Sequence, residues 1–292
     1  MRHGNDKRGC FIAFCTIVGV GLAIATPATG SDGVIEINQA RALAGGVTPG
    51  DSPGFPVTIS QPGSYRLTGN LDVTVAADPK NTDAIDVTAD NVTIDLNGFS
   101  ILGPAVCSGR PVTSCTNTGS GAGVYGAAGL GGYLVVRNGT IQGMGGSGVY
   151  TYLPYVAIER VLTVSCGSGG ILISNGTVSK CQAANNGGDG ISDSGPGVVS
   201  ESMALYNQGA GISVEETVVS GNTAHSNGGV GILVTLLGTA SNNTMYNNAG
   251  VGLQCIGGGS LSNSFYNNNG GGAQSTGCVI LGPNDCGTSL CP

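Results

Sequence analysis

Apolar and polar positions recur along the chain with a period of 20 to 25 residues, beginning near residue 120. Nearly all periods contain a Gly-x-Gly-apolar unit, and its second glycine marks the repeat: Gly123, Gly148, Gly170, Gly190, Gly211, Gly231, Gly252 and Gly272. Seven positions before the last five of these glycines the residue is apolar: Ala183, Ala204, Ala224, Met245 and Phe265. A fixed period of this length indicates stacked units of one architecture.

Asparagine also keeps to the period. It stands four positions before the last five anchor glycines, as Asn186, Asn207, Asn227, Asn248 and Asn268. Glycines this dense leave no room for helices of ten or more residues, whereas strands of three to five residues fit between them. Asparagine and glycine tolerate the left-handed backbone that tight corners require. The pattern therefore predicts one coil of a parallel β-helix per period, with these asparagines in one buried column at a corner.

The repeat VSGNTAHSNGGVGI, from Val219 to Ile232, resembles the coils of the right-handed parallel β-helix superfamily, the pectate-lyase-like proteins. The resemblance covers roughly residues 57–279. It implies an all-β protein built as a single right-handed solenoid, and parallel crossovers are in general right-handed. The superfamily includes lyases, hydrolases, epimerases, adhesins and proteins without known activity, so the fold alone does not assign a function.

The rest of the chain divides around this solenoid. Residues 1–28 have a basic start and a short apolar stretch, which predicts a secretory signal peptide, with an uncleaved membrane anchor as the alternative. Residues 29–62 are expected to form a cap and loop, including a helix at residues 34–44 that covers the first coil. The β-helix is expected over residues 63–281, with a protruding loop at residues 103–121, and residues 282–292 form a cysteine-containing tail.

Charge and the signal peptide limit the partners. After residue 28 the chain has seven Lys and Arg against sixteen Asp and Glu, a net charge near −9. An acidic surface argues against nucleic acid as a partner. No later segment is long and apolar enough to span a bilayer. We therefore expect a secreted or cell-envelope protein, extracellular or periplasmic, and the resemblance implies a polysaccharide or a cell-surface glycan as its partner.

Eight cysteines follow residue 28, and an even number in an exported chain suggests disulfides. Pairing of nearest neighbours is the simplest of many connectivities: Cys107 with Cys115, Cys166 with Cys181, Cys255 with Cys278, and Cys286 with Cys291. A zinc site is the alternative, although the sequence has no Cys-x-x-Cys and only one histidine after residue 28.

An acidic group lies in the first coils. The run Asn81-Thr82-Asp83-Ala84-Ile85-Asp86 resembles the first catalytic motif of polygalacturonases, in which carboxylates act as acid and base. The other motifs of that family are missing. Asp83 and Asp86 are therefore weak candidates for a Ca²⁺ site, since hard cations take oxygen ligands, or simply solvated turn residues.

A basic group comes next. Arg160, Lys180 and Glu201 lie ten positions before successive anchors, so the register predicts one outward column, with Arg137 one coil earlier. In polysaccharide lyases of the superfamily, an Arg or Lys removes a proton beside a uronate carboxylate, with Ca²⁺ neutralising the acid. Stacked cations would favour such a base. The alternative is that Glu159 and Glu201 pair with these cations at the surface.

His225, Tyr246 and Tyr266 lie six positions before successive anchors, next to the inward column, so they are expected to point outward. Exposed aromatic rings can bind sugars, and they can equally brace successive coils. The sequence thus favours an exported β-helix protein with a non-catalytic role, either glycan binding or structural. A polysaccharide-active enzyme that works by β-elimination is the alternative.

Overall fold

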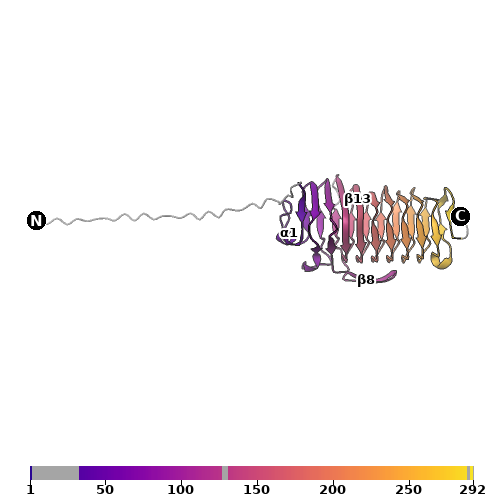
Figure 1. Cartoon of the computed structure of the whole chain (residues 1–292), viewed down its shortest axis with the longest axis horizontal. Coiled ribbons are helices and arrows are strands. Elements are labelled where there is room, and N and C mark those ends of the chain that lie inside the picture. The colour runs from indigo at the N-terminus through magenta and orange to yellow at the C-terminus, as the bar shows by residue number, and fades with distance from the viewer. Residues whose placement is uncertain (2–32, 127–130, 288–289, 292) are drawn as a thin grey trace.

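The computed structural model describes residues 1, 33–126, 131–287 and 290–291. Apart from Met1, the expected signal peptide lies outside the described residues. The described chain forms an elongated stack of β-coils (Figure 1). None of its helices has the length and apolar character needed to cross a membrane.

One face of the stack is a ten-stranded parallel sheet, to which each coil contributes a short strand. Its strands are β2 (Val57–Ile59), β5 (Ile85–Val87), β10 (Val124–Gly126), β12 (Val149–Thr151), β14 (Ile171–Ile173), β17 (Ile191–Asp193), β20 (Ile212–Glu215), β23 (Ile232–Thr235), β26 (Leu253–Ile256) and β29 (Ser275–Thr276). The strands begin directly after the anchor glycines from Gly123 to Gly252, so the predicted register is confirmed.

The remaining faces form a twenty-stranded sheet that continues around a corner. It begins with β1 (Ile35–Ile37), β3 (Gly63–Leu67), β4 (Leu71–Asp72), β6 (Val92–Asp95) and β7 (Ser100–Leu102), followed by the long strands β11 (Tyr133–Gln142) and β13 (Tyr155–Val164). Later coils divide into pairs: β15 (Gly176–Ser179) and β16 (Gln182–Ala184), β18 (Gly197–Ser200) and β19 (Met203–Leu205), β21 (Val218–Ser220) and β22 (Thr223–His225), β24 (Thr239–Ser241) and β25 (Thr244–Tyr246), β27 (Gly259–Leu261) and β28 (Ser264–Tyr266), β30 (Val279–Ile280) and β31 (Asn284–Asp285). The final strand β32 (Leu290–Cys291) pairs with β31 in antiparallel fashion.

The core lies inside the coils. Strand residues alternate between buried and partly exposed, as in β23, where Ile232 and Val234 are fully buried while Leu233 and Thr235 are not. The inward column predicted from the sequence is buried throughout, from Ala183 to Phe265. Stacking each inward residue on its equivalent in the next coil gives one continuous apolar core along the axis.

The predicted asparagine column is confirmed. Each asparagine before Asn268 uses its side-chain Nδ2 to donate to Oδ1 of the next, at 2.9 Å from Asn186 to Asn207 and 3.0 Å from Asn207 to Asn227. The same Oδ1 atoms accept backbone N–H groups, for example that of Asn207 by Asn227 at 3.0 Å. The column therefore satisfies turn amides that would otherwise be buried without partners.

A second ladder, which the sequence analysis missed, runs along the neighbouring corner. Its members lie nine positions before successive anchors: Cys181, Ser202, Asn222, Asn243 and Asn263, followed by Asn284. Asn222 donates to Asn243 at 3.0 Å, and Asn243 donates to Asn263 at 3.0 Å. Asn284 belongs to the expected tail, so the regular stacking extends beyond residue 281.

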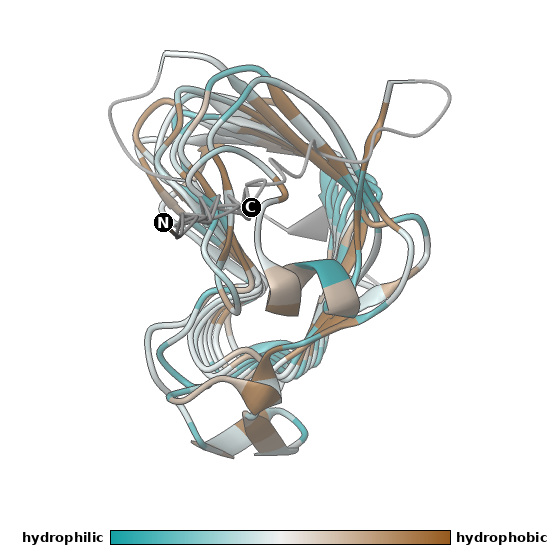
Figure 2. Ribbon diagram, turned by 90° about the vertical axis from the view of Figure 1, so that its left-hand side faces the viewer, coloured by the Kyte–Doolittle hydropathy of each residue, from teal (hydrophilic) through white to brown (hydrophobic). Residues whose placement is uncertain are grey.

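The N-terminal cap differs from the helix predicted at residues 34–44. Its first half is strand β1, which pairs with β3, because Ile35 and Ile37 are β-branched and alternate with Glu36. Helix α1 (Gln39–Ala44) follows, with the Asn38 side chain accepting from the backbone N–H of Arg41 at its start. Figure 2 shows α1 lying across the end of the stack, where it buries Ala42 against the core.

The disulfides confirm part of the predicted pairing. Cys107–Cys115 and Cys255–Cys278 are bridged. Cys286 is also disulfide-bonded, while the side chain of Cys291 lies outside the described residues. The pairing of Cys166 with Cys181 is wrong, because both are buried free thiols.

The two thiols start separate ladders, which explains why they do not meet. The backbone N–H of Cys166 donates to Asn186 at 3.0 Å, and that of Cys181 donates to Ser202 at 3.1 Å. Each cysteine thus takes the place that asparagine or serine occupies in later coils.

The loop expected at residues 103–121 contains an antiparallel hairpin of β8 (Val106–Gly109) and β9 (Val112–Thr116), joined by the first disulfide. The hairpin extends along the outside of the stack (Figure 1). The backbone N–H of Val112 donates to the carbonyl of Tyr206 at 2.9 Å, so the hairpin is tied to a coil far along the chain. The short 3-10 turns η1 (Val73–Val75) and η2 (Asn269–Gly271) complete the described elements.

Candidate functional site

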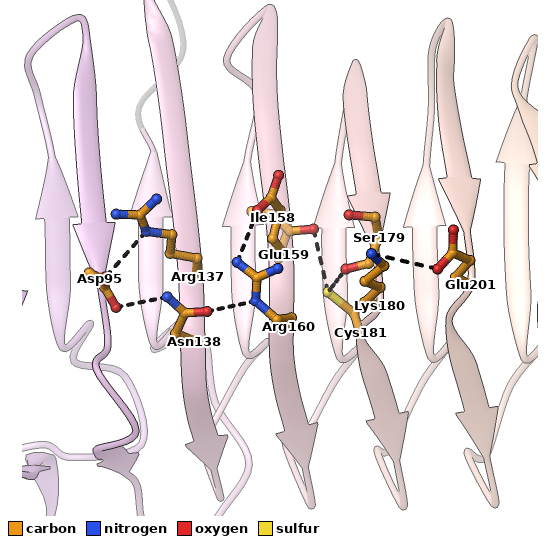
Figure 3. A network of polar contacts seen from close by, with 10 residues as sticks. All are labelled: Asp95, Arg137, Asn138, Ile158, Glu159, Arg160, Ser179, Lys180, Cys181 and Glu201. Carbon is orange, nitrogen blue, oxygen red and sulfur yellow. Dashed lines mark hydrogen bonds and ion pairs between the residues drawn. The ribbon is translucent and has the colours of Figure 1, made fainter.

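Arg160, Lys180 and Glu201 share one turn position, whereas Arg137 lies opposite Glu159 in the register of β11 and β13. Each of the three cations has an acidic partner (Figure 3). The ion pairs join Arg137 to Asp95 at 3.2 Å, Arg160 to Glu159 at 3.5 Å and Lys180 to Glu201 at 3.7 Å. A β-eliminating base needs neighbours that disfavour its positive charge, whereas here the nearest charges are carboxylates. The geometry is that of the surface ion-pair alternative.

Hydrogen bonds of the Asn138 side-chain amide connect the first of these charged groups. Asn138 donates from Nδ2 to Asp95 at 3.2 Å and accepts from Nε of Arg160 at 2.8 Å (Figure 3). A shallow depression of about 330 Å³ beside it is lined by residues including Asn138, Arg160 and Lys180. The side chains of Arg160 and Lys180 are more than half exposed, so water screens their charges.

Backbone geometry explains why these residues share one column. Arg160, Lys180 and Glu201 have φ of 51°, 54° and 49°, in the left-handed region that non-glycine residues seldom adopt. In later coils the same turn position holds Gly221, Asn242 and Ser262, also with positive φ. The column is therefore first of all a series of turn residues.

The acidic pair lies at the start of the ten-stranded sheet. Asp83 accepts the backbone N–H of Ala122 at 2.6 Å, and one carboxylate oxygen of Asp86 is buried without a hydrogen-bond partner. Burial raises the pKa of both carboxyls; the Ala122 hydrogen bond opposes the rise for Asp83, and the Asp86 charge adds to it. Within the described part of the chain, no three His, Cys, Asp or Glu side chains are grouped closely enough to hold a metal ion.

The aromatic column has the predicted register, with His225 opposite Tyr246 and Tyr246 opposite Tyr266. His225 and Tyr246 stack with ring centroids 4.0 Å apart and planes 16° apart. Tyr206 adds an edge-on contact to His225 at 5.1 Å, and the Arg110 guanidinium from the hairpin lies 5.4 Å from the Tyr206 ring. The first part of the column therefore braces coils and hairpin, while Tyr266 is 48% exposed.

Two further groups of tyrosines were missed by the sequence analysis. Tyr125, Tyr150 and Tyr152 form one group, in which the Tyr150 and Tyr152 hydroxyls are in contact. That contact, with burial adding to it, raises the pKa of Tyr150 to about 12. The group lies beside a small hollow of about 150 Å³ that includes Tyr150 and Tyr152.

Tyr133 and Tyr155 form the other group, at the start of β11 and β13. Their rings stack with centroids 5.1 Å apart, and they line a groove of about 560 Å³. A sequence signal for this pair exists, because each tyrosine lies fifteen positions before an anchor, Gly148 or Gly170. Of the hollows on the stack described above, this one is the largest and is lined mainly by apolar atoms.

Comparison with known families agrees with this architecture. The profile described as "Right handed beta helix region" matches residues 120–270, more than half of the chain. The chain belongs to the right-handed β-helix family. Within this β-helix protein the matched region contains both asparagine ladders up to Asn268. A comparison with curated proteins finds no match.

Solved structures similar to this β-helix protein include the Dettilon tailspike protein gp208, with a TM-score of 0.54 and 16% identity over 77% of this chain and 50% of that chain. The A-module of Azotobacter vinelandii mannuronan C-5 epimerase AlgE4 has a TM-score of 0.49 and 20% identity, over 71% and 68%. PfbA, a surface adhesin of Streptococcus pneumoniae, has a TM-score of 0.38 and 10% identity, over 88% and 78%. At these identities the likeness is one of fold alone.

Proposed function

We propose that this protein is an exported, non-catalytic β-helix protein that binds glycans through tyrosines on its surface. One observation carries the proposal: among the residues that the structure describes, the strongly exposed aromatic side chains are all tyrosines. Four of them are about half exposed or more, namely Tyr133 at 61%, Tyr155 at 54%, Tyr152 at 48% and Tyr266 at 48%. A tyrosine combines an apolar ring with a hydroxyl group, which suits a sugar's apolar faces and polar edges.

The same surface gives little support to catalysis. Arg160 and Lys180, the candidate bases, are each in an ion pair, and the Asp83–Asp86 pair lies on earlier coils. Export is supported by the bridges Cys107–Cys115 and Cys255–Cys278, since disulfides persist in oxidising compartments. His225, Tyr246 and Tyr266 remain in the proposal as a secondary contact strip, of which Tyr266 is the exposed end.

Affinity electrophoresis of the chain from residue 29 onward, in gels containing neutral or uronate polysaccharides, tests the proposal. We expect at least one glycan to retard the protein. Incubation with the same polysaccharides, with and without Ca²⁺, should leave the ultraviolet absorbance of unsaturated products unchanged. Lack of retardation by every glycan would contradict glycan binding. Product formation lost on Lys180→Gln or Arg160→Gln would replace the proposal with β-elimination.

A further inference from the structure

The groove beside Tyr133 and Tyr155 lies where the long strands of the twenty-stranded sheet begin. Tyr133 is opposite Tyr155 in the register of β11 and β13, and the following coils contribute Asn175, Thr177 and Pro196. Pro154 lines the groove as well, and these four residues (Pro154, Asn175, Thr177 and Pro196) are called its rim below. The groove thus draws on four successive coils rather than on one loop.

Among the residues that the structure describes, the lining of the groove has no charged side chain. The lining that is not on the rim is apolar or backbone, including Val135 and Ala157, whose side chains point outward from their strands. A charged ligand would find no counter-ion in this groove, so the surface favours an uncharged one.

The groove also offers hydrogen-bonding groups that the fold does not use. Within the described part of the chain, the hydroxyls of Tyr133, Tyr155 and Thr177 and the amide of Asn175 have no hydrogen-bond partner. An apolar partner would leave these groups unpaired, at a cost in free energy. A ligand with apolar faces and many hydroxyls satisfies both the rings and the polar groups.

The length of the groove indicates a ligand with more than one sugar ring. Neighbouring strands are about 4.8 Å apart, so contact with all four coils needs a ligand about 14 Å long. The Tyr133 and Tyr155 rings already stack on each other, with planes 30° apart, so binding costs little of their side-chain entropy.

We infer that this groove is the principal subsite for a neutral oligosaccharide, contacted by Tyr133, Tyr155 and Asn175. The inference rests on the proposed glycan-binding function and specifies where and what the protein binds. It places the main contact away from the His225–Tyr246–Tyr266 column and from the ion-paired cations.

Three variants test the assignment against a matched control. Tyr133→Ala and Tyr155→Ala remove one ring each, and Tyr155→Phe removes only a hydroxyl. Leu237→Ala removes an exposed apolar side chain from a later coil, as a control, and Tyr266→Ala removes a ring from the other proposed strip. Melting temperatures confirm that each variant is folded. Binding is measured by affinity electrophoresis and calorimetry with hydroxyethylcellulose and galactomannan as neutral probes, and polygalacturonate as the anionic one.

We expect Tyr155→Ala and Tyr133→Ala to weaken binding of a neutral probe about tenfold or more, as for aromatic rings that the bound ligand covers. Tyr155→Phe should weaken binding less. Leu237→Ala should change it less than about twofold, and Tyr266→Ala should weaken it less than either groove tyrosine does. Retention lost only on Tyr266→Ala, or binding of polygalacturonate alone, would overturn the groove while leaving glycan binding intact. Failure of the unaltered protein to bind any probe would overturn the proposed function itself.

Discussion

The coils before and after Cys181 differ in what their corners contain. After Cys181 the anchors follow every 20 or 21 residues, two side-chain ladders run along the corners, and the sequence contains no Lys or Arg. Before it the spacings are longer and a hairpin is inserted. All the cations lie there, with three of the four most exposed tyrosines. In the later coils the same side-chain ladders accept the backbone N–H groups of the turns. The earlier coils have turns of varying length and expose groups that can contact a ligand.

Removing one ladder residue should give the largest effect on stability. Asn227 accepts from the backbone and the side chain of Asn207 and donates to Ala204 and Asn248. Asn227→Leu leaves several buried groups without partners, so we expect a loss of about 4 kcal/mol or more in unfolding free energy. Denaturant unfolding followed by circular dichroism measures it.

Gln254→Leu is the matched control, because it makes a similar chemical change at an outward position of β26. It should alter the unfolding free energy by less than about 1 kcal/mol. Equal losses in the two variants would mean that the ladder is no more important than any surface amide.

Asp193 occupies an inward position of the ten-stranded sheet at which the neighbouring coils have apolar residues. It should make the stability of the protein depend on pH. It is 1% exposed between Ile173 and Val214, and one of its carboxylate oxygens has no hydrogen-bond partner. Burial raises its pKa to about 7, although hydrogen bonds from Gly195 and Thr217 oppose the rise. The folded protein therefore holds a proton between about pH 4 and pH 7 that the unfolded chain has released.

Stability from this group is fully present below about pH 4, falls as the pH rises to about 7, and is then constant. We expect a loss of roughly 2–4 kcal/mol over this range, seen as a melting temperature several degrees lower at pH 8 than at pH 4. Asp193→Asn should remove most of that slope. Asp86→Asn, which alters a less buried acid, should leave most of it, and an unchanged slope in the Asp193 variant would exclude this cause.

The regular coils could be predicted from the sequence because each position of the repeat contacts the equivalent position of the next coil. Asn207 and Asn227 lie 20 residues apart and meet in the structure, and the same holds for His225 and Tyr246 at 21. The second ladder has an equally regular spacing but begins with Cys181 and Ser202, so its first members do not look like asparagines. Cysteines were paired by proximity in sequence, and that rule failed where two cysteines belong to different ladders.

The candidate site was less predictable because it depends on which side chains are exposed to solvent, and the spacing of residues does not give that. Tyr133 and Tyr155 are 22 residues apart in coils of irregular length, and the groove beside them also needs Asn175 and Thr177 from the next coil. The shared turn position of Arg160, Lys180 and Glu201 was predictable, but Arg137 lies one residue away from it. Acidic partners decide the chemistry of these cations, and Asp95, which pairs with Arg137, comes from an earlier coil.

The free thiols give a prediction of intermediate size. Burial raises the pKa of Cys166 to about 12 and that of Cys181 to about 11, so neither should react in the folded protein. In the chain from residue 29 onward, titration with a thiol reagent should find none in native protein and two per chain in unreduced, denatured protein. Cys166→Ala should cost about 1–2 kcal/mol, as for a small cavity. No thiols after denaturation would restore the disulfide between Cys166 and Cys181.

The smallest effect should come from the turn position that the two regions fill differently. Glu201 has φ of 49° and pairs with Lys180 at 3.7 Å, whereas Asn242 holds the same turn in a later coil without an ion pair. An exposed pair is worth less than about 1 kcal/mol, so Glu201→Gln should lower the unfolding free energy by about 0.5 kcal/mol or less. Glu201→Asn loses the same pair but gains a residue that tolerates positive φ, so it should be as stable as the unaltered protein or about 0.5 kcal/mol more stable. If Glu201→Asn instead loses more than Glu201→Gln, the ion pair rather than the backbone conformation determines this position.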